Sequence, residues 1–144
     1  MSASHITVVE PPGWPRPKGY VNGMLAVGRS LHVAGQVGWN ERCEIVGPDL
    51  PAQFDQALAN VLAVVRAAGG APEHVVTLTF FCTDLPAYEA SQRELGAIWR
   101  KHFGKHYPAM ALIGVAGLIE KGALCELLAT AVLPMPDASA GGAP

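Results

Sequence analysis

Apolar residues recur every three or four positions in two segments of the chain, which predicts two amphipathic helices. The first covers residues 51–68, where Asp49 and a nearby proline are typical of a helix start and a glycine pair is typical of its end. The second begins at Asp84, which is again followed closely by a proline, and ends near Gly104. We expect each helix to bury one apolar face.

Around these helices lie segments that are rich in β-branched and aromatic residues, as strands are. Residues 74–83 are especially rich in β-branched and aromatic residues, as a strand that is buried on both faces would be. Residues 109–115 and 123–133 predict two further strands. Two short runs, residues 21–28 and 30–39, are separated by a glycine-containing turn, and we expect them to pair as a hairpin.

The order of these elements predicts an α+β fold with one sheet that is covered on one face by two helices. The other face would stay apolar and open, so we expect the chain to associate with copies of itself. Residues 1–133 are predicted to form a single domain. Residues 1–18 are expected to be an extended arm or an edge because four prolines fall within seven positions, and the small residues of 134–144 predict a mobile tail.

The composition narrows the classes of partner. Of 144 residues, 50% are hydrophobic and 15% are charged, with a formal net charge of -2, which disfavours disorder and nucleic-acid binding. Cys43, Cys82 and Cys125 are far apart and contain no CxxC pair, so we expect neither a disulfide framework nor a zinc knuckle, as suits the reducing cytoplasm. No apolar run approaches about 18 residues, and no basic flank precedes an apolar stretch at the N-terminus, so we expect neither a membrane span nor export.

Several short motifs, taken in order, resemble the RidA/YjgF superfamily of reactive-intermediate deaminases, also called the endoribonuclease L-PSP family. The similarity covers roughly residues 20–133. The motifs that carry it are Lys18-Gly19-Tyr20, Val33-Ala34-Gly35-Gln36-Val37, Gln56-Ala57-Leu58-Ala59-Asn60-Val61, Thr83-Asp84-Leu85, Tyr107-Pro108-Ala109 and Lys121-Gly122-Ala123-Leu124-Cys125-Glu126.

The resemblance implies a chorismate-mutase-like fold that assembles as a homotrimer, with the sheets forming a central barrel. It also implies three clefts at the subunit boundaries, each of which holds a small-molecule ligand. The deaminating members of the family hydrolyse enamines or imines, such as 2-aminoacrylate, to a keto acid and ammonia. They use neither a metal nor an organic cofactor, so we expect none here.

One position departs from the family motif. The family carries Pro-Ala-Arg, whose arginine grips the substrate carboxylate, whereas this chain has Met110 at the matching place. A guanidinium can hold a carboxylate through two charge-assisted hydrogen bonds, each worth about 1.5 to 3 kcal/mol, and a thioether donates none. We therefore expect imines of simple amino acids to bind poorly. Met110 would form an apolar wall of the cleft, or else fill the core as methionines in apolar runs commonly do.

The resemblance assigns the other site residues. Glu126 would be the general acid/base, because a carboxyl among apolar neighbours holds its proton more tightly than one in water. Tyr20 would donate its hydroxyl to the substrate or to water. Alternatively, Glu126 pairs with another charge or turns to solvent, and Tyr20 is only a wall residue. The family's Ser-Gly-Gln becomes Ala34, Gly35 and Gln36, and its cysteine becomes Leu112. Together with Met110, these four residues would contact the ligand. One extra residue also lies near Ile119 and Glu120.

Other residues give weaker signals. Arg42, Lys105 and His106 are candidate anion contacts; the alternative is that these charged side chains point into solvent. His102 and His106 are four residues apart, but the helix end between them disfavours a zinc site. The glycines match no phosphate-binding order, so a nucleotide is not expected.

Three functions follow from these observations. The first is a small-molecule hydrolase of enamines or imines whose specificity is altered by Met110. The second is a non-catalytic trimer that binds or senses a small metabolite. The third, ribonuclease activity, is suggested by the older family name alone and is disfavoured by the acidic charge balance and the lack of a basic stripe.

Overall fold

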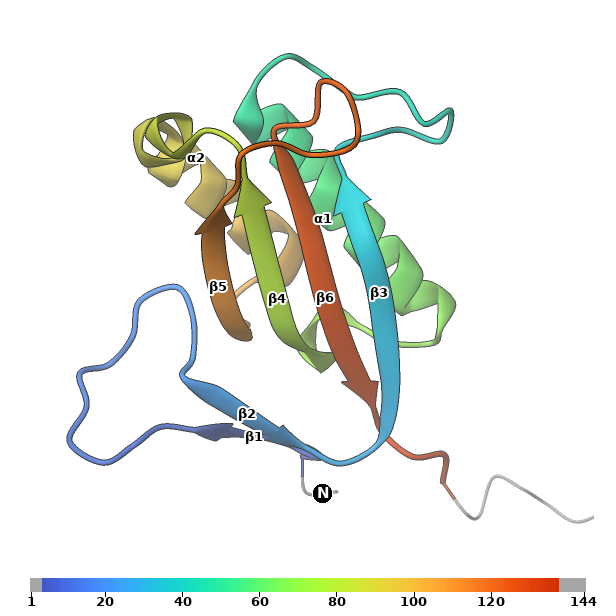
Figure 1. Ribbon diagram of the computed structural model, residues 1–144. Coiled ribbons are helices and arrows are strands. Elements are labelled where there is room, and N and C mark those ends of the chain that lie inside the picture. Colours follow the sequence, from blue (N-terminus) through green and yellow to red (C-terminus); the bar gives the residue numbers. More distant parts are fainter. Residues whose placement is uncertain (1–3, 138–144) are drawn as a thin grey trace, which may run out of the picture.

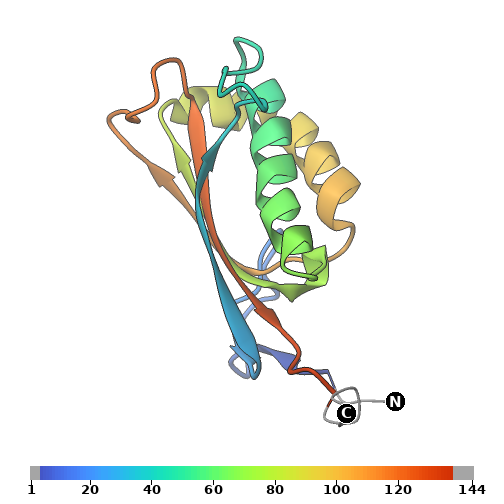
Figure 2. The ribbon, with the colours of Figure 1, turned by 90° about the vertical axis from the view of Figure 1, so that its right-hand side faces the viewer.

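The computed structural model describes residues 4–137, and its central feature is a four-stranded mixed sheet (Figure 1). The strands lie in the order β3 (Arg29–Val37), β6 (Cys125–Leu133), β4 (Val75–Cys82) and β5 (Ala109–Gly114). β6 is antiparallel to both of its neighbours, whereas β4 and β5 are parallel. Two helices, α1 (Leu50–Ala67) and α2 (Leu85–Phe103), cover one face of the sheet (Figure 2). The predicted α+β fold with both helices on one face is confirmed.

Both helices begin and end where the sequence predicted. The Asp49 carboxylate accepts a hydrogen bond from the Ala52 N–H at 2.9 Å, and the Asp84 carboxylate accepts one from the Ala87 N–H at 3.0 Å. Each aspartate thus satisfies one of the unpaired donors of a first helical turn. α2 ends at Gly104, whose φ of 61° lies in the left-handed region that favours glycine.

The core lies between the helices and the covered face of the sheet. Leu58 and Leu62 of α1 are fully buried, as is Leu127 of β6. The rings of Phe54 and Phe80 stack with their centroids 4.9 Å apart, which joins α1 to β4. Burying this apolar surface on one side is the main force that holds the two layers together.

The other face of the sheet is open in the single chain. On β4, Thr77 is exposed, and Thr79 and Phe81 are only half-buried, whereas the residues that alternate with them are buried. The prediction that this strand is buried on both faces is therefore wrong for one chain alone. The open face of β4 still carries one large apolar side chain, that of Phe81. Whether other copies of the chain cover this face stays a prediction.

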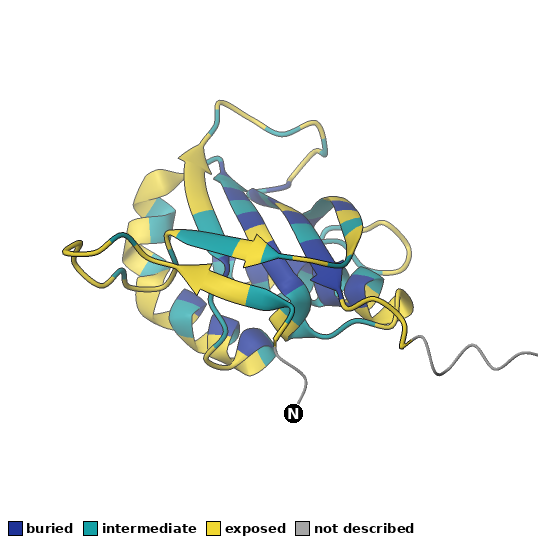
Figure 3. Cartoon of the chain, turned by 90° about the horizontal axis from the view of Figure 1, so that it is seen from below, coloured by how far each residue is buried: buried dark blue, intermediate teal, exposed yellow. Residues whose placement is uncertain are grey.

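The first two strands form a separate two-stranded sheet, which lies in the foreground of Figure 3. β1 (Ile6–Val9) pairs antiparallel with β2 (Gly23–Ala26), and β3 pairs with β6. The predicted hairpin between residues 21–28 and 30–39 is therefore wrong. The partner of a strand can lie far from it in the sequence. Here the partner of β2 is a run of four β-branched residues, β1, which lies in the N-terminal segment that was expected to be an arm or an edge. A further short 3-10 helix, η1 (Pro72–His74), precedes β4.

After β6 the chain passes the first residue of β3, Arg29. The Arg29 side chain donates hydrogen bonds to the Pro134 carbonyl at 3.3 Å. Most of the predicted tail at 134–144 lies outside the described residues. No helix in residues 4–137 is both long enough and apolar enough to cross a membrane.

Candidate functional site

A pocket at the edge of β5 brings together three of the residues that the sequence singled out. The Val21 N–H donates to the Pro108 carbonyl at 3.2 Å, and Val21 forms a parallel bridge with Ala109. This pairing brings the segment that contains Tyr20 to the edge of β5. Tyr20 and Met110 line a pocket of about 370 Å³, here called the β5 pocket, whose wall consists of Lys18, Gly19, Tyr20, Phe80, Tyr88, Met110, Ala111 and Leu112.

Met110 satisfies both interpretations that its residue type left open. It lies opposite Leu78 of β4 in the parallel ladder, and Leu78 faces the helices and is 1% exposed. The side chain of Met110 therefore packs against the core while it also lines the β5 pocket. Tyr20 is 43% exposed, so its ring forms the outer wall.

Glu126 lies on the open face of the sheet. Its neighbours Cys125 and Leu127 are fully buried toward the helices, and side chains alternate along a strand. Its carboxyl lies over Gly35 of β3: a Cβ added to Gly35 would be 2.1 Å from Glu126 Oε1. The β3–β6 ladder shifts register between Val33 and Gln36, which marks a bulge at this point. Glycine at position 35 therefore leaves the space that the carboxyl occupies.

The two residues that flank Gly35 complete this group, here called the Glu126 cluster. The Gln36 side-chain amide donates to the Ala34 carbonyl at 3.0 Å, so it is folded back onto its own strand. Ala34 is exposed and has no hydroxyl to offer. The Glu126 carboxyl is the remaining group of the cluster that can accept or deliver a proton.

The β5 pocket and the Glu126 cluster do not meet within one chain. β4 separates β6 from β5, so these two strands are two strand spacings apart, or about 9.6 Å. Glu126 is in register with Ile113 of β5, which lies three residues beyond Met110 along that strand. The pocket and the cluster also lie on opposite faces, because Met110 packs toward the helices and Glu126 points away from them. The structure therefore divides the predicted site residues into two halves.

Gln53 is an anchoring residue that the sequence analysis missed. It is 1% exposed, and its amide donates to the carbonyls of Gly47 and Gly122 at 3.2 and 3.1 Å. Its side-chain oxygen accepts a hydrogen bond from the Leu124 N–H at 2.7 Å. This side chain fixes the start of β6, two residues before Glu126. A polar residue at a position of the apolar helix face, next to Phe54, was the signal that could have identified it.

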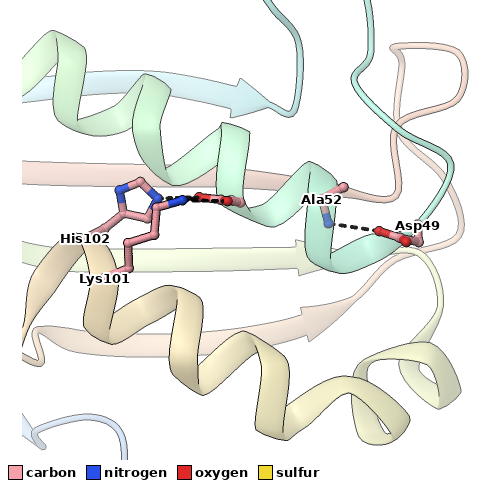
Figure 4. Close-up of polar contacts among 5 residues, drawn as sticks. Asp49, Ala52, Lys101 and His102 are labelled. Atoms are coloured by element: carbon pink, nitrogen blue, oxygen red, sulfur yellow. Dashed lines mark hydrogen bonds and ion pairs between the residues drawn. The ribbon is translucent and has the colours of Figure 1, made fainter.

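The two histidines that were considered as metal ligands turn to different partners. His102 Nε2 lies 2.5 Å from an Asp55 carboxylate oxygen, and Lys101 Nζ lies 2.8 Å from the other oxygen (Figure 4). The His106 ring donates to the Val75 carbonyl at 2.8 Å. In residues 4–137, no group of three or more His, Cys, Asp or Glu side chains is placed to hold a metal ion.

The Asp55 contacts link α1 to α2 and change the acidity of the carboxyl. Burial alone would raise the pKa of Asp55, but the hydrogen bonds and positive charges of Lys101 and His102 outweigh it and lower the pKa below the usual 3.8. This cluster joins the two helices (Figure 4), and none of its three residues lines the β5 pocket. It is an interhelical ion pair.

Cys82 and Cys125 behave as small core residues, as predicted. They lie opposite each other on β4 and β6, and both are fully buried. Burial raises the pKa of the Cys125 thiol to about 12 and also raises that of Cys82. The thiolates that nucleophilic chemistry requires are therefore disfavoured. Cys43 is exposed in the loop after β3.

The basic residues considered as anion contacts are divided between two places. Lys105 and His106 line a cavity of about 620 Å³ beneath the proline-rich loop, where Arg16 and Tyr20 also contribute to the wall. Arg42 is exposed in the loop between β3 and α1. None of the three lines the β5 pocket.

Comparison with known proteins settles which family has this arrangement. The family model described as "Endoribonuclease L-PSP" matches residues 15–133, which is most of the chain. The chain belongs to this family, the RidA/YjgF superfamily. A crystal structure of a Rid-family protein of unknown function, YyfB from Yersinia pestis, has a TM-score of 0.79 and 36% identity, and covers 90% of this chain and all of its own.

Relatives with names that mention function differ from one another. A 2-iminobutanoate/2-iminopropanoate deaminase of Dermatophagoides farinae is 28% identical over 127 residues, which are 88% of this chain and 95% of the relative. A proposed regulator, AldR, of Lactococcus lactis is 32% identical over 109 residues, which are 75% of this chain and 82% of the relative. The chain is therefore similar both to a protein that is named as a deaminase and to one that is named for regulation.

Proposed function

We propose that this member of the RidA/YjgF superfamily is a cofactor-independent hydrolase of small enamines or imines, with a specificity that Met110 has altered. The observation that carries the proposal is the Glu126 carboxyl, which is half-buried and held against Gly35. Within residues 4–137 it forms no ion pair that would explain it as a structural charge. A carboxyl in such a place can move protons in a reaction.

The two halves of the site come together between copies of the chain. The open face of the sheet carries Phe81, Ile113 and Leu128, of which the last two are 42% and 46% exposed. Covering these side chains with neighbouring sheets in a homotrimer would close an apolar barrel. It would also place the edges of the sheets, including β5 and its pocket, at subunit boundaries next to the Glu126 cluster of another copy.

The chemistry in this cleft follows from the groups available. Water adds to the carbon of the C=N bond while Glu126 accepts a proton from it. Glu126 passes this proton to the nitrogen, which gives the neutral carbinolamine. It then accepts the proton of the carbinolamine hydroxyl and delivers it to the same nitrogen, so that the C–N bond breaks, the C=O bond forms and ammonia leaves. The Tyr20 hydroxyl orients the substrate or the water. No electrons are transferred, so no redox partner is required.

The test is ammonia release from a panel of imines generated from amino acids of different size. Glu126→Gln should lower kcat about 10²-fold or more, because a general acid/base contributes that much. Glu94→Gln, an exposed position on α2, is the matched control and should retain full activity. Turnover that is unaffected by Glu126→Gln would exclude the proposed role, and an absence of turnover on every imine would exclude the activity.

A second function is favoured by Met110 together with the similarity to AldR. If the carboxylate grip is lost and no reaction follows, the cleft would bind or sense a metabolite. A ligand at 100 times its Kd then stabilises the folded protein by about 2.7 kcal/mol without any product being formed. A thermal-shift screen with product analysis separates this function from the hydrolase.

A further inference from the structure

The β5 pocket does not end at Met110. A second pocket, of about 350 Å³, shares five wall residues with it: Lys18, Gly19, Phe80, Tyr88 and Met110. The two are therefore parts of one continuous groove. At one end lie Tyr20 and Leu112, and at the other the groove reaches under α2. Met110 lies at the junction of the two parts.

The far part of the groove has an aromatic floor whose polar groups are already satisfied. Trp99 is 5% exposed, stacks on Tyr107 with ring centroids 6.0 Å apart, and donates its indole N–H to the His106 carbonyl at 3.0 Å. Phe80 contacts Tyr88 edge to face, with centroids 5.9 Å apart. Because these rings are held by one another, the surface is preformed for a flat apolar group.

The charged residues of the groove are all of one sign. Lys18 lies in the shared wall and Arg100 lies at the far end, and no Asp or Glu lines either part. A Cβ on Gly96 would be 3.3 Å from Arg100 Nη1, so the guanidinium lies against the helix beside the groove, where glycine leaves room for it. Within residues 4–137, neither Lys18 nor Arg100 forms an ion pair.

We infer that the groove binds an organic anion with an aromatic body, whose ring lies over Met110 and the aromatic floor and whose carboxylate contacts Arg100 or Lys18. An arginine at position 110 would place a charge in the middle of the groove and stop a ligand short of it. Methionine keeps the junction apolar, so the positive charge is found at the far end and in the shared wall instead. This inference rests on the proposed function for its reaction and makes its substrate class narrower: among enamines and imines, it predicts a preference for those of aromatic amino acids.

Three related probes, which differ in the ring or in the charge, test the binding mode by isothermal titration of the full chain. The probes are 3-phenylpropanoate, propanoate, which lacks the ring, and 3-phenylpropanamide, which lacks the charge. We expect 3-phenylpropanoate to bind at least about tenfold more tightly than either of the others. Equal binding of the three probes, or no binding of any, as when a side chain of a neighbouring copy fills the groove, would overturn the inference.

Substitutions then locate the anion contact. Arg100→Gln, Lys18→Gln or the double variant should weaken 3-phenylpropanoate about three- to tenfold and leave 3-phenylpropanamide unchanged. Arg93→Gln, an exposed change on α2 outside the groove, is the control for net charge. Met110→Arg should weaken 3-phenylpropanoate and strengthen propanoate. A double variant that behaves like Arg93→Gln would overturn the assignment.

Ammonia release measured on the same samples separates this inference from the proposed function. Binding of 3-phenylpropanoate that depends on Arg100 or Lys18, without hydrolysis of any imine, would support the groove as a binding site and exclude the hydrolase. Hydrolysis of small imines that is unchanged by Arg100→Gln and Lys18→Gln, with no preference for aromatic ones, leaves the hydrolase in place and removes the groove.

Discussion

The two faces of the sheet differ in what covers them. The covered face is completed by α1 and α2 of the same chain, and no buried side-chain nitrogen or oxygen in residues 4–137 lacks a hydrogen-bond partner (Figure 2). The open face shows half-exposed Ile113 and Leu128, and it carries the Glu126 carboxyl. Adjacent residues of β6 thus serve different ends: Cys125 and Leu127 specify the fold, and Glu126 is available for chemistry. On this strand, the core residues and the proposed acid/base therefore alternate between the two faces of the sheet.

The largest effect is expected on the open face. Leu128→Lys should convert the proposed trimer into single chains, because the new ammonium would be buried among apolar side chains of other copies. Light scattering or sedimentation measures the mass directly. Ala63→Lys, on the exposed side of α1, should leave the mass unchanged. A wild-type protein that is already monomeric would show that the open face needs no partner.

On the covered face, Leu62→Ala should lower the free energy of unfolding by about 2 to 5 kcal/mol, because it leaves a cavity in a closed core. Leu62 is fully buried, whereas Leu25 on β2 is 66% exposed. Leu25→Ala is therefore the matched control, with an expected change within about 0.5 kcal/mol. Urea unfolding of both variants measures the difference, and equal costs would contradict the assignment of the core.

A third change acts at the contact between β3 and β6. Gly35→Ala places a methyl group where the Glu126 carboxyl lies, so it should cost about 1 to 3 kcal/mol and displace the carboxyl. Gly117→Ala is the control, since nothing lies within 4 Å of its added Cβ. If Gly35→Ala lowers activity no more than Gly117→Ala does, the position of the carboxyl is not used in the reaction.

The smallest effect is expected in the helical layer. Because the pKa of Asp55 is lowered in the folded state, its contribution to stability is present above the usual pKa of 3.8 and is lost as the pH falls through the folded value. The carboxylate is partly exposed, so Asp55→Asn should cost no more than about 1 kcal/mol near neutral pH, and less in high salt. The difference between wild type and Asp55→Asn should shrink between pH 5 and pH 3. A difference that is constant over this range would exclude the ion pair as its cause.

The helices were predictable because their signals are local. Asp49, Asp84 and Gly104 each mark a helix terminus by its own chemistry within one turn. The pairing of β2 was not predictable, because hydrogen bonding between strands depends on segments that are distant in the sequence. For the same reason the site residues Gly35 and Glu126 could be named separately, but the overlap of their positions depends on a bulge that no local pattern indicates.

The site showed the same limit. The family position of Met110 indicated a ligand cleft, and in the single chain Met110 lines the β5 pocket. The sequence gives no sign that Arg100, on α2, borders the same groove, since only the packing of the helix beside β5 brings the two near each other. If Arg100 supplies the positive charge that position 110 lacks, the two positions are neighbours only in the folded chain.

Gln53 separates the turn before β6 from the strand itself. Its one side chain holds Gly122 and Leu124, so the backbone is fixed immediately downstream of Ile119 and Glu120. We therefore expect an added or deleted residue in that turn to be absorbed by the exposed segment before Gly122. The length of this loop could then change without moving the carboxyl two positions beyond Leu124.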